Sequence, residues 1–201
     1  LAPAGFLRAG DRAHLILAFG GGLGGYRHEH NSLAVGVLAD RGGDEAPRVH
    51  WVQPEASVAG TGTRIRRCAH TATYVPARCF AEAQLFPEGV VVFFGGHHEN
   101  GRELAHIQLL CVKTWAWFSC PLVGGMQLTP THGHSAALVE RDGGTYVVFV
   151  GGGTGSILDD PARCQEHSIA QVIELHSLSG GHRVGGRPLP TVQLAHETPT
   201  V

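Results

Sequence analysis

Hydrophobic residues in this chain gather in short runs, and three of these runs end at a pair of glycines. Val90–Phe94 and Val147–Val150 consist only of β-branched and aromatic residues, and His14–Phe19 is a similar, largely apolar run near the start. The two continuous runs, Val90–Phe94 and Val147–Val150, predict strands buried on both faces, because a strand with one exposed face would alternate apolar and polar residues. The glycines that follow end the strand and let the backbone turn sharply, with positive φ where the turn requires it.

Three other patterns accompany these runs. Cys68–Val75 and His132–Val139 share a histidine followed by Ser or Thr and then Ala, and their small residues suit a strand crowded against its neighbours. A further apolar strand is expected after each glycine pair, at Ser32–Asp40, Leu104–Val112 and Ser168–His176. Tryptophan marks a last strand in two places, Val49–Pro54 and Thr114–Cys120. Because Trp115 and Trp117 are two residues apart, we expect their side chains on one face of that strand.

The order of these patterns predicts an all-β fold built from repeated four-stranded units. Each unit has a strand of small residues, an apolar strand that ends in Gly-Gly, a third apolar strand and a tryptophan strand. The 29 glycines and 11 prolines fit many short strands separated by turns. With 43% hydrophobic and 16% charged residues, the chain has the composition of a folded domain rather than a disordered one.

The four-strand unit resembles the kelch repeat, in which Gly-Gly ends the second strand and an aromatic residue, usually Trp, follows downstream. A kelch repeat forms one antiparallel blade of a β-propeller and has a period of about 50 residues. The resemblance implies that residues 1–201 are a single kelch-type β-propeller fragment, with approximate blades at 1–54, 66–120 and 131–190 and the start of a further blade at 191–201. The repeat's own positions, where we expect structural roles, are Gly20, Gly21, His70, Gly95, Gly96, Trp115, Trp117, His134, Gly151 and Gly152.

The third unit departs from this pattern, because no tryptophan follows His176 where the fourth strand should stand. Propellers usually close with about 4 to 8 blades, so three units are too few for a closed ring. The sequence also starts at Leu1 rather than at a methionine. We therefore expect the remaining blades to come from the rest of a longer chain.

Charge and cysteine content narrow the functional classes. The formal net charge of −2 gives no electrostatic reason to expect nucleic acid or an anionic membrane as a partner, and the small basic cluster of Arg64, Arg66 and Arg67 is expected to be solvated at the entrance of a strand. The five cysteines are odd in number and include no Cys-x-x-Cys pair, which favours reduced thiols. No apolar stretch approaches the roughly 20 residues of a membrane-spanning helix. These observations predict a cytoplasmic or nuclear protein.

Polar residues gather in the loops after the glycine pairs. In a propeller, equivalent loops of successive blades emerge on one face, so the resemblance implies that these loops converge. We expect this loop face to bind a segment of another protein, and we predict no cofactor and no metal ion there. Its candidate binding residues are His28, His30, His97, His98, Glu99, Asp159, Asp160 and His167.

Two motifs imitate cofactor or metal sites. Gly20, Gly22 and Gly25 match the dinucleotide-binding pattern, but the short segment before the next strand leaves no room for the helix that binds the pyrophosphate. His132 and His134 have a spacing that could place two imidazoles on one strand face, but no acidic residue follows at the distance that a cupin-like metal site needs.

The resemblance implies two classes of function. The favoured class is a non-enzymatic, protein-binding module that recognises substrates or acts as a scaffold within a larger intracellular protein, such as a ubiquitin-ligase adaptor. The alternative is a metal-dependent kelch-type enzyme, either a copper-radical oxidase similar to galactose oxidase or an iron-assisted enzyme. Of the three tyrosines, Tyr74 and Tyr146 lie in predicted strands, which counts against a tyrosyl-radical site. The sequence indicates no catalytic residue.

Overall fold

The structure is a computed structural model, and its strands form antiparallel sheets. It describes residues 2–22, 32–40, 42, 46–55, 65–80, 86–98, 103–120, 127–155, 165–166, 170–176, 183–184, 187–188 and 191–197. Within these ranges there is no α-helix, and the one helical element is the short 3₁₀ turn η1 (Ala77–Cys79). The all-β prediction is confirmed.

Three sheets make up most of the structure, and we call them the N-terminal, central and C-terminal sheets. The N-terminal sheet contains, in this order, β1 (Arg12–Phe19), β2 (Leu33–Asp40) and β3 (Arg48–Val52). The central sheet contains, in this order, β4 (Thr71–Val75), β5 (Val90–Phe94), β6 (Ile107–Cys111) and β7 (Trp117–Cys120). The C-terminal sheet has the order β15-β12-β9-β8 and contains β8 (Ser135–Arg141), β9 (Gly144–Val150), β12 (Ala170–His176) and β15 (Thr191–Glu197). Two short pairs join β10 (Gly153–Thr154) to β11 (Gln165–Glu166) and β13 (Arg183–Val184) to β14 (Arg187–Pro188).

The last strand of the C-terminal sheet, β15, lies in the segment Thr191–Val201. The sequence pattern predicts that this segment opens a further unit. Instead, β15 pairs with β12, with Leu194 opposite Ile173, and is the fourth strand of the C-terminal sheet. This strand has no tryptophan, so the aromatic signal that marks β3 and β7 could not indicate it.

The N-terminal sheet has only three described strands. Strand β1 precedes the first glycine pair, so it corresponds to β5 and β9 in the other two sheets. Those sheets each have one more strand on that side, β4 and β8 respectively. No described strand takes the equivalent place beside β1.

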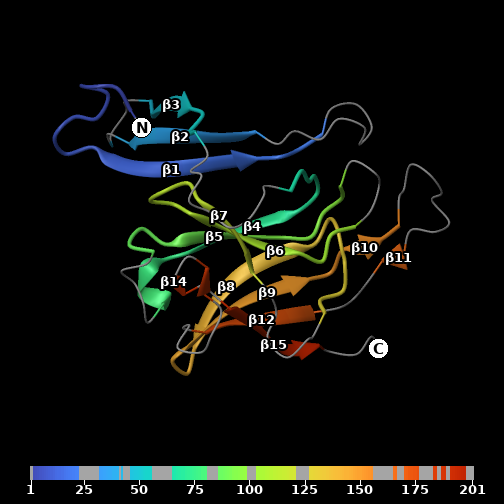
Figure 1. Cartoon of the computed structure of the whole chain (residues 1–201). Coiled ribbons are helices and arrows are strands. Elements are labelled where there is room, and N and C mark those ends of the chain that lie inside the picture. Colours follow the sequence, from blue (N-terminus) through green and yellow to red (C-terminus); the bar gives the residue numbers. More distant parts are fainter. Residues whose placement is uncertain are drawn as a thin grey trace.

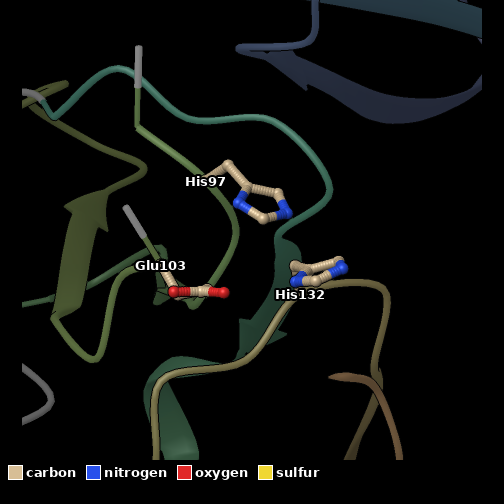
Figure 2. Close-up of side chains that lie close together, drawn as sticks. All are labelled: His97, Glu103 and His132. Carbon is tan, nitrogen blue, oxygen red and sulfur yellow. The ribbon is translucent and has the colours of Figure 1, made fainter. Parts of the chain in front are cut away.

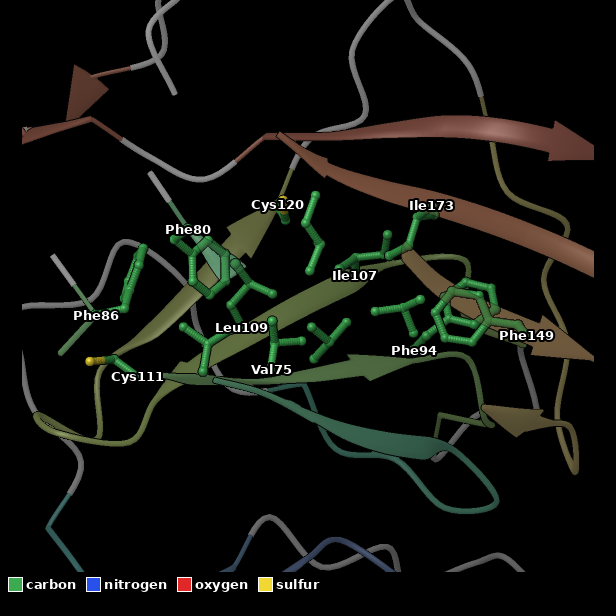
Figure 3. Packing of buried hydrophobic residues seen from close by; sticks show 14 of the residues in the cluster. Val75, Phe80, Phe86, Phe94, Ile107, Leu109, Cys111, Cys120, Phe149 and Ile173 are labelled. Atoms are coloured by element: carbon green, nitrogen blue, oxygen red, sulfur yellow. The ribbon is translucent and has the colours of Figure 1, made fainter. Parts of the chain in front are cut away.

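The three sheets lie one above the other (Figure 1). Clusters of buried apolar side chains lie between them. The core between the central and C-terminal sheets includes Phe94, Leu109, Phe149 and Ile173 (Figure 3). A second cluster joins the N-terminal and central sheets. All five residues of β5 are buried, as predicted for a strand in a sheet that is covered on both faces.

Strand β9 does not share this burial. Its buried residues alternate with half-buried or exposed ones, and Val150 is 53% exposed. The prediction of two buried faces is therefore wrong for β9, because no described sheet covers the outer face of the C-terminal sheet. The outer face of the N-terminal sheet is open in the same way, with Trp51 51% exposed.

The glycine pairs make the same contact at both junctions between sheets. The Gly21 N–H donates to the carbonyl of Arg67 (3.1 Å), and the Gly96 N–H donates to the carbonyl of Thr131 (2.8 Å). Gly95 has a φ of +66°, and a Cβ there would collide with the Thr131 carbonyl. Glycine is required here because the segment leading into the next sheet passes against the turn.

The paired tryptophans do not share a strand. Trp115 has a φ of +58° and lies in the turn before β7, which begins at Trp117. The prediction that both belong to one strand is wrong, although both indoles pack into the cluster between the N-terminal and central sheets.

Arg67 also differs from its prediction, because it is fully buried rather than solvated. Its guanidinium donates to the carbonyl of Gly95 (3.2 Å) and to Oε1 of Gln108 (2.9 Å). Burial lowers the pKa of Arg67 to about 10. Arg67 therefore acts as a cross-link between the entry to the central sheet and its inner strands.

The predicted thiols are present at the described cysteines, Cys68, Cys79, Cys111 and Cys120. In the part of the chain that the structure describes, no helix has the length and apolar character needed to cross a membrane.

Candidate functional site

The structure describes two of the predicted loop-face residues, His97 and His98. His97 directly follows the glycine pair of β5 and is only 5% exposed, while His98 is partly exposed. The other candidates lie outside the described residues: His28, His30, Glu99, Asp159, Asp160 and His167. Convergence of all eight residues on one face therefore stays a prediction.

His97 lies next to two residues that the sequence did not assign to the site, Glu103 and His132. The potential ligand atoms of these three side chains all lie within 4.8 Å of one another. The ring centroids of His97 and His132 are 3.9 Å apart, and the Glu103 carboxylate is directed toward them (Figure 2). Both histidines are buried and Glu103 is half-buried, so we call this group the His-Glu-His cluster.

Backbone pairing holds the cluster in place from three segments. His97 exchanges two hydrogen bonds with Cys68 (2.9 and 3.2 Å), and His132 exchanges two with Gly153 (3.1 and 3.0 Å). The Glu103 carboxylate accepts a hydrogen bond from the Gly155 N–H, beyond the end of β10. The cluster therefore lies at the junction of the central and C-terminal sheets, on a frame set by main-chain contacts.

The surroundings of His132 lower its pKa. Burial lowers the pKa of His132, the neighbouring His97 lowers it further, and the Glu103 carboxylate opposes both effects. Nδ1 of His132 is buried and has no hydrogen-bond partner among the described residues. Two imidazoles and a carboxylate are a donor set that zinc and related divalent transition ions bind.

The sequence pattern does not reveal this cluster, because the backbone turns at Gly133. The expectation that His132 and His134 could share one strand face is wrong, since Gly133 between them has a φ of +65°. His132 turns toward His97, whereas Nε2 of His134 lies 2.8 Å from Oγ1 of Thr71. In the sequence, the sign of this cluster is His97, which directly follows the second glycine pair.

His70 and His134 occupy equivalent places at the two junctions between sheets. The His70 ring packs between Phe19 and Phe93, with centroid distances of 5.8 and 5.7 Å. The His134 ring packs between Phe94 and Phe149, at 5.2 and 5.7 Å.

Their hydrogen bonding differs. His134 has the hydroxyl of Thr71, the first residue of β4, as its partner, and we find no equivalent hydroxyl beside His70 among the described residues. The counterpart of Thr71 for His70 would belong to a strand beside β1, a place where the structure describes none.

A cavity of about 520 Å³ adjoins this open edge of β1. Leu15 and Leu17 of β1 line one side, and Tyr74, Glu88 and Val112 of the central sheet and its connections line the other. The Gly20 N–H donates to the carbonyl of Ser32 (3.3 Å), so Gly20 and Ser32 form a hydrogen-bonded pair. In the register of β1 with β2, Gly20 and every second residue before it therefore bond to β2. Hydrogen bonds alternate along an antiparallel pair, and the N–H and C=O groups of Leu15 and Leu17 therefore point away from β2, toward the open edge.

Comparison with known proteins gives no family assignment: no protein-family model and no curated protein matches the chain.

Proposed function

We propose that this chain is part of a kelch-type β-propeller that binds other proteins without catalysing a reaction, and that an extended segment of the partner adds to the N-terminal sheet beside β1. The single observation that carries the proposal is the open edge of β1, where the two other sheets each have a further strand. In this role the protein recognises substrates or scaffolds an assembly, as an adaptor of a ubiquitin ligase does.

The edge has the properties of a docking site for a strand. β1 has eight residues, and its outward N–H and C=O groups have no described partner strand. A long, flat edge strand is a template for pairing with another chain, and proteins that use it in this way bind extended peptides. The cavity beside Leu15 and Tyr74 offers space for side chains of the added strand.

The neighbouring sheets indicate the chemistry of the occupant. The equivalent strands, β4 and β8, begin with Thr71 and Ser135 and continue with alanine. Thr71 lies opposite Phe94, and its hydroxyl meets His134. An added strand in the same register would place a Ser or Thr opposite Phe19, within reach of His70.

A peptide that copies the residues leading into and forming β8, HGHSAALVER, is the probe. The test compares its affinity for the parent chain, for Leu15→Pro and for Leu15→Ala by fluorescence anisotropy. Proline removes the outward N–H in the middle of the open edge without touching a bond to β2, because proline is tolerated at strand edges whose N–H faces solvent. Leu15→Ala loses the same side chain but keeps the N–H, so it is the matched control.

We expect the parent and Leu15→Ala to bind the peptide, with Leu15→Pro weaker by about tenfold, which corresponds to about 1.4 kcal/mol for lost backbone hydrogen bonding. A peptide in which Ala replaces the serine should bind several-fold more weakly than its parent. Equal affinity of Leu15→Pro and Leu15→Ala, or no binding to the parent chain, would contradict the proposal.

A further inference from the structure

The His-Glu-His cluster has the composition of a metal centre, and this inference is independent of the proposed function at β1. We propose that His97, Glu103 and His132 bind one divalent transition ion of the zinc class. No ion is needed to bring the three side chains together, because main-chain hydrogen bonds of His97, His132 and their partners already position them.

The distances suit such an ion. Zinc binds imidazole nitrogen and carboxylate oxygen at about 2.0–2.2 Å, which places the ligand atoms of a tetrahedral site about 3.3–3.6 Å apart. The ligand atoms of the cluster lie within 4.8 Å of one another. Small side-chain rotations that move each ligand atom by roughly an ångström would bring them to the spacing of a zinc site. Small rotations are available to Glu103 because its side chain is half-buried.

The chemistry of the donors selects the class of ion. Two imidazoles and one carboxylate match the sets that bind Zn²⁺, whereas Mg²⁺ and Ca²⁺ prefer sites made of oxygen ligands. A buried imidazole nitrogen without a hydrogen-bond partner, as at Nδ1 of His132, carries an energetic cost that a metal ion would remove.

The position of the cluster gives the ion a structural role. His97 follows β5 and Glu103 precedes β6 of the central sheet, and His132 lies in the segment that leads into β8 of the C-terminal sheet. Glu103 also accepts the Gly155 N–H from the far side of the junction. A bound ion would cross-link the two sheets.

The experiment titrates the metal-stripped chain with Zn²⁺ by isothermal calorimetry and, in parallel, with Co²⁺ by visible absorption, which reports tetrahedral coordination. The variants are Glu103→Gln and His132→Asn. Glutamine keeps an oxygen that can accept from Gly155, so Glu103→Gln removes the ligand charge while preserving the described hydrogen bond. The matched control is His98→Ala, which removes the neighbouring, partly exposed histidine outside the cluster.

We expect one tightly bound Zn²⁺ per parent chain and per His98→Ala chain, with the intense Co²⁺ bands of a tetrahedral site. Loss of an outer-shell partner alone costs about 10- to 100-fold in metal affinity, so each ligand variant should lose about 100-fold or more. Unchanged affinity in both ligand variants, or an equal loss in His98→Ala, would overturn the site and identify the binding as adventitious. The titration uses no peptide, so its failure leaves the proposal for β1 standing, and the converse also holds.

Discussion

Single glycines at the ends of strands set how closely the sheets approach. Gly95 illustrates two separate demands, because its φ of +66° disfavours any side chain and a Cβ would collide with the Thr131 carbonyl and lie 2.6 Å from Cε1 of His134. Gly133 has almost the same φ, +65°, but no atom lies within 4 Å of its Cβ position. Comparing Gly95 with Gly133 therefore separates two contributions to stability, the cost of positive φ and the cost of a steric collision.

Replacing each of these glycines by alanine should therefore give different losses of stability. Gly133→Ala should lower the free energy of unfolding by about 1–2 kcal/mol, the cost of a left-handed conformation for a residue with a Cβ. Gly95→Ala should lose at least about 2 kcal/mol more, because the backbone of Thr131 must move. Urea denaturation measures both values, and equal losses would show that the contact between Gly95 and Thr131 is not tight.

At the scale of elements, buried glutamines tie each connecting segment to the sheet that follows it. Gln171 of β12 is 3% exposed; its Oε1 accepts from the Thr129 N–H (2.8 Å) and its Nε2 donates to the Thr129 carbonyl (3.1 Å). Gln108 takes the equivalent place in β6 and accepts from the Ile65 N–H (3.2 Å). Ile65 and Thr129 each lie six residues before the first strand of their sheet, so the arrangement repeats.

Replacing Gln171 by leucine should destabilise the chain although the position stays filled. The N–H and C=O of the half-buried Thr129 would both lose their described partner, and an unsatisfied group costs about 1–3 kcal/mol when it is buried. We expect a loss of about 2–4 kcal/mol in urea denaturation, together with faster hydrogen exchange at the Thr129 amide. A loss below about 1 kcal/mol would mean that water replaces the glutamine.

At the scale of the whole molecule, the sequence predicts strands and turns, which depend on local pattern. It does not predict burial or side-chain clusters, which depend on contacts between distant segments. Apolar runs and glycine pairs located β5 and β9 because strand formation and turning are local. The exposure of Val150 was not predictable, since it depends on whether another sheet lies against the outer face. The His-Glu-His cluster was missed for the same reason, because Glu103 and His132 meet through pairing between segments far apart in the sequence.

The junction between the N-terminal and central sheets should make stability depend on pH through His70. Burial, with the nearby positive charge of Arg67 and then His134, lowers the pKa of His70 from 6.5 to about 4. Between these pH values the unfolded chain binds a proton that the folded chain does not, so the free energy of unfolding is at its full value above about pH 6.5 and falls as the pH decreases toward 4. His70 alone accounts for up to about 3 kcal/mol of this fall.

The measurement is urea denaturation of the parent chain and of His70→Asn at several pH values from 7 to 4, with a chelator present so that metal binding does not contribute. His70→Asn should be less stable at pH 7, because it loses the packing between Phe19 and Phe93, but its stability should fall less steeply with acid. Parallel curves would show that His70 titrates normally in the folded chain. A partner strand that brings a hydroxyl to His70 should lower the pKa of His70 further if the hydroxyl donates to Nε2, because this hydrogen bond stabilises the neutral ring. Repeating the pH series with the β8 peptide therefore tests whether a strand at the open edge of β1 changes the ionisation of His70.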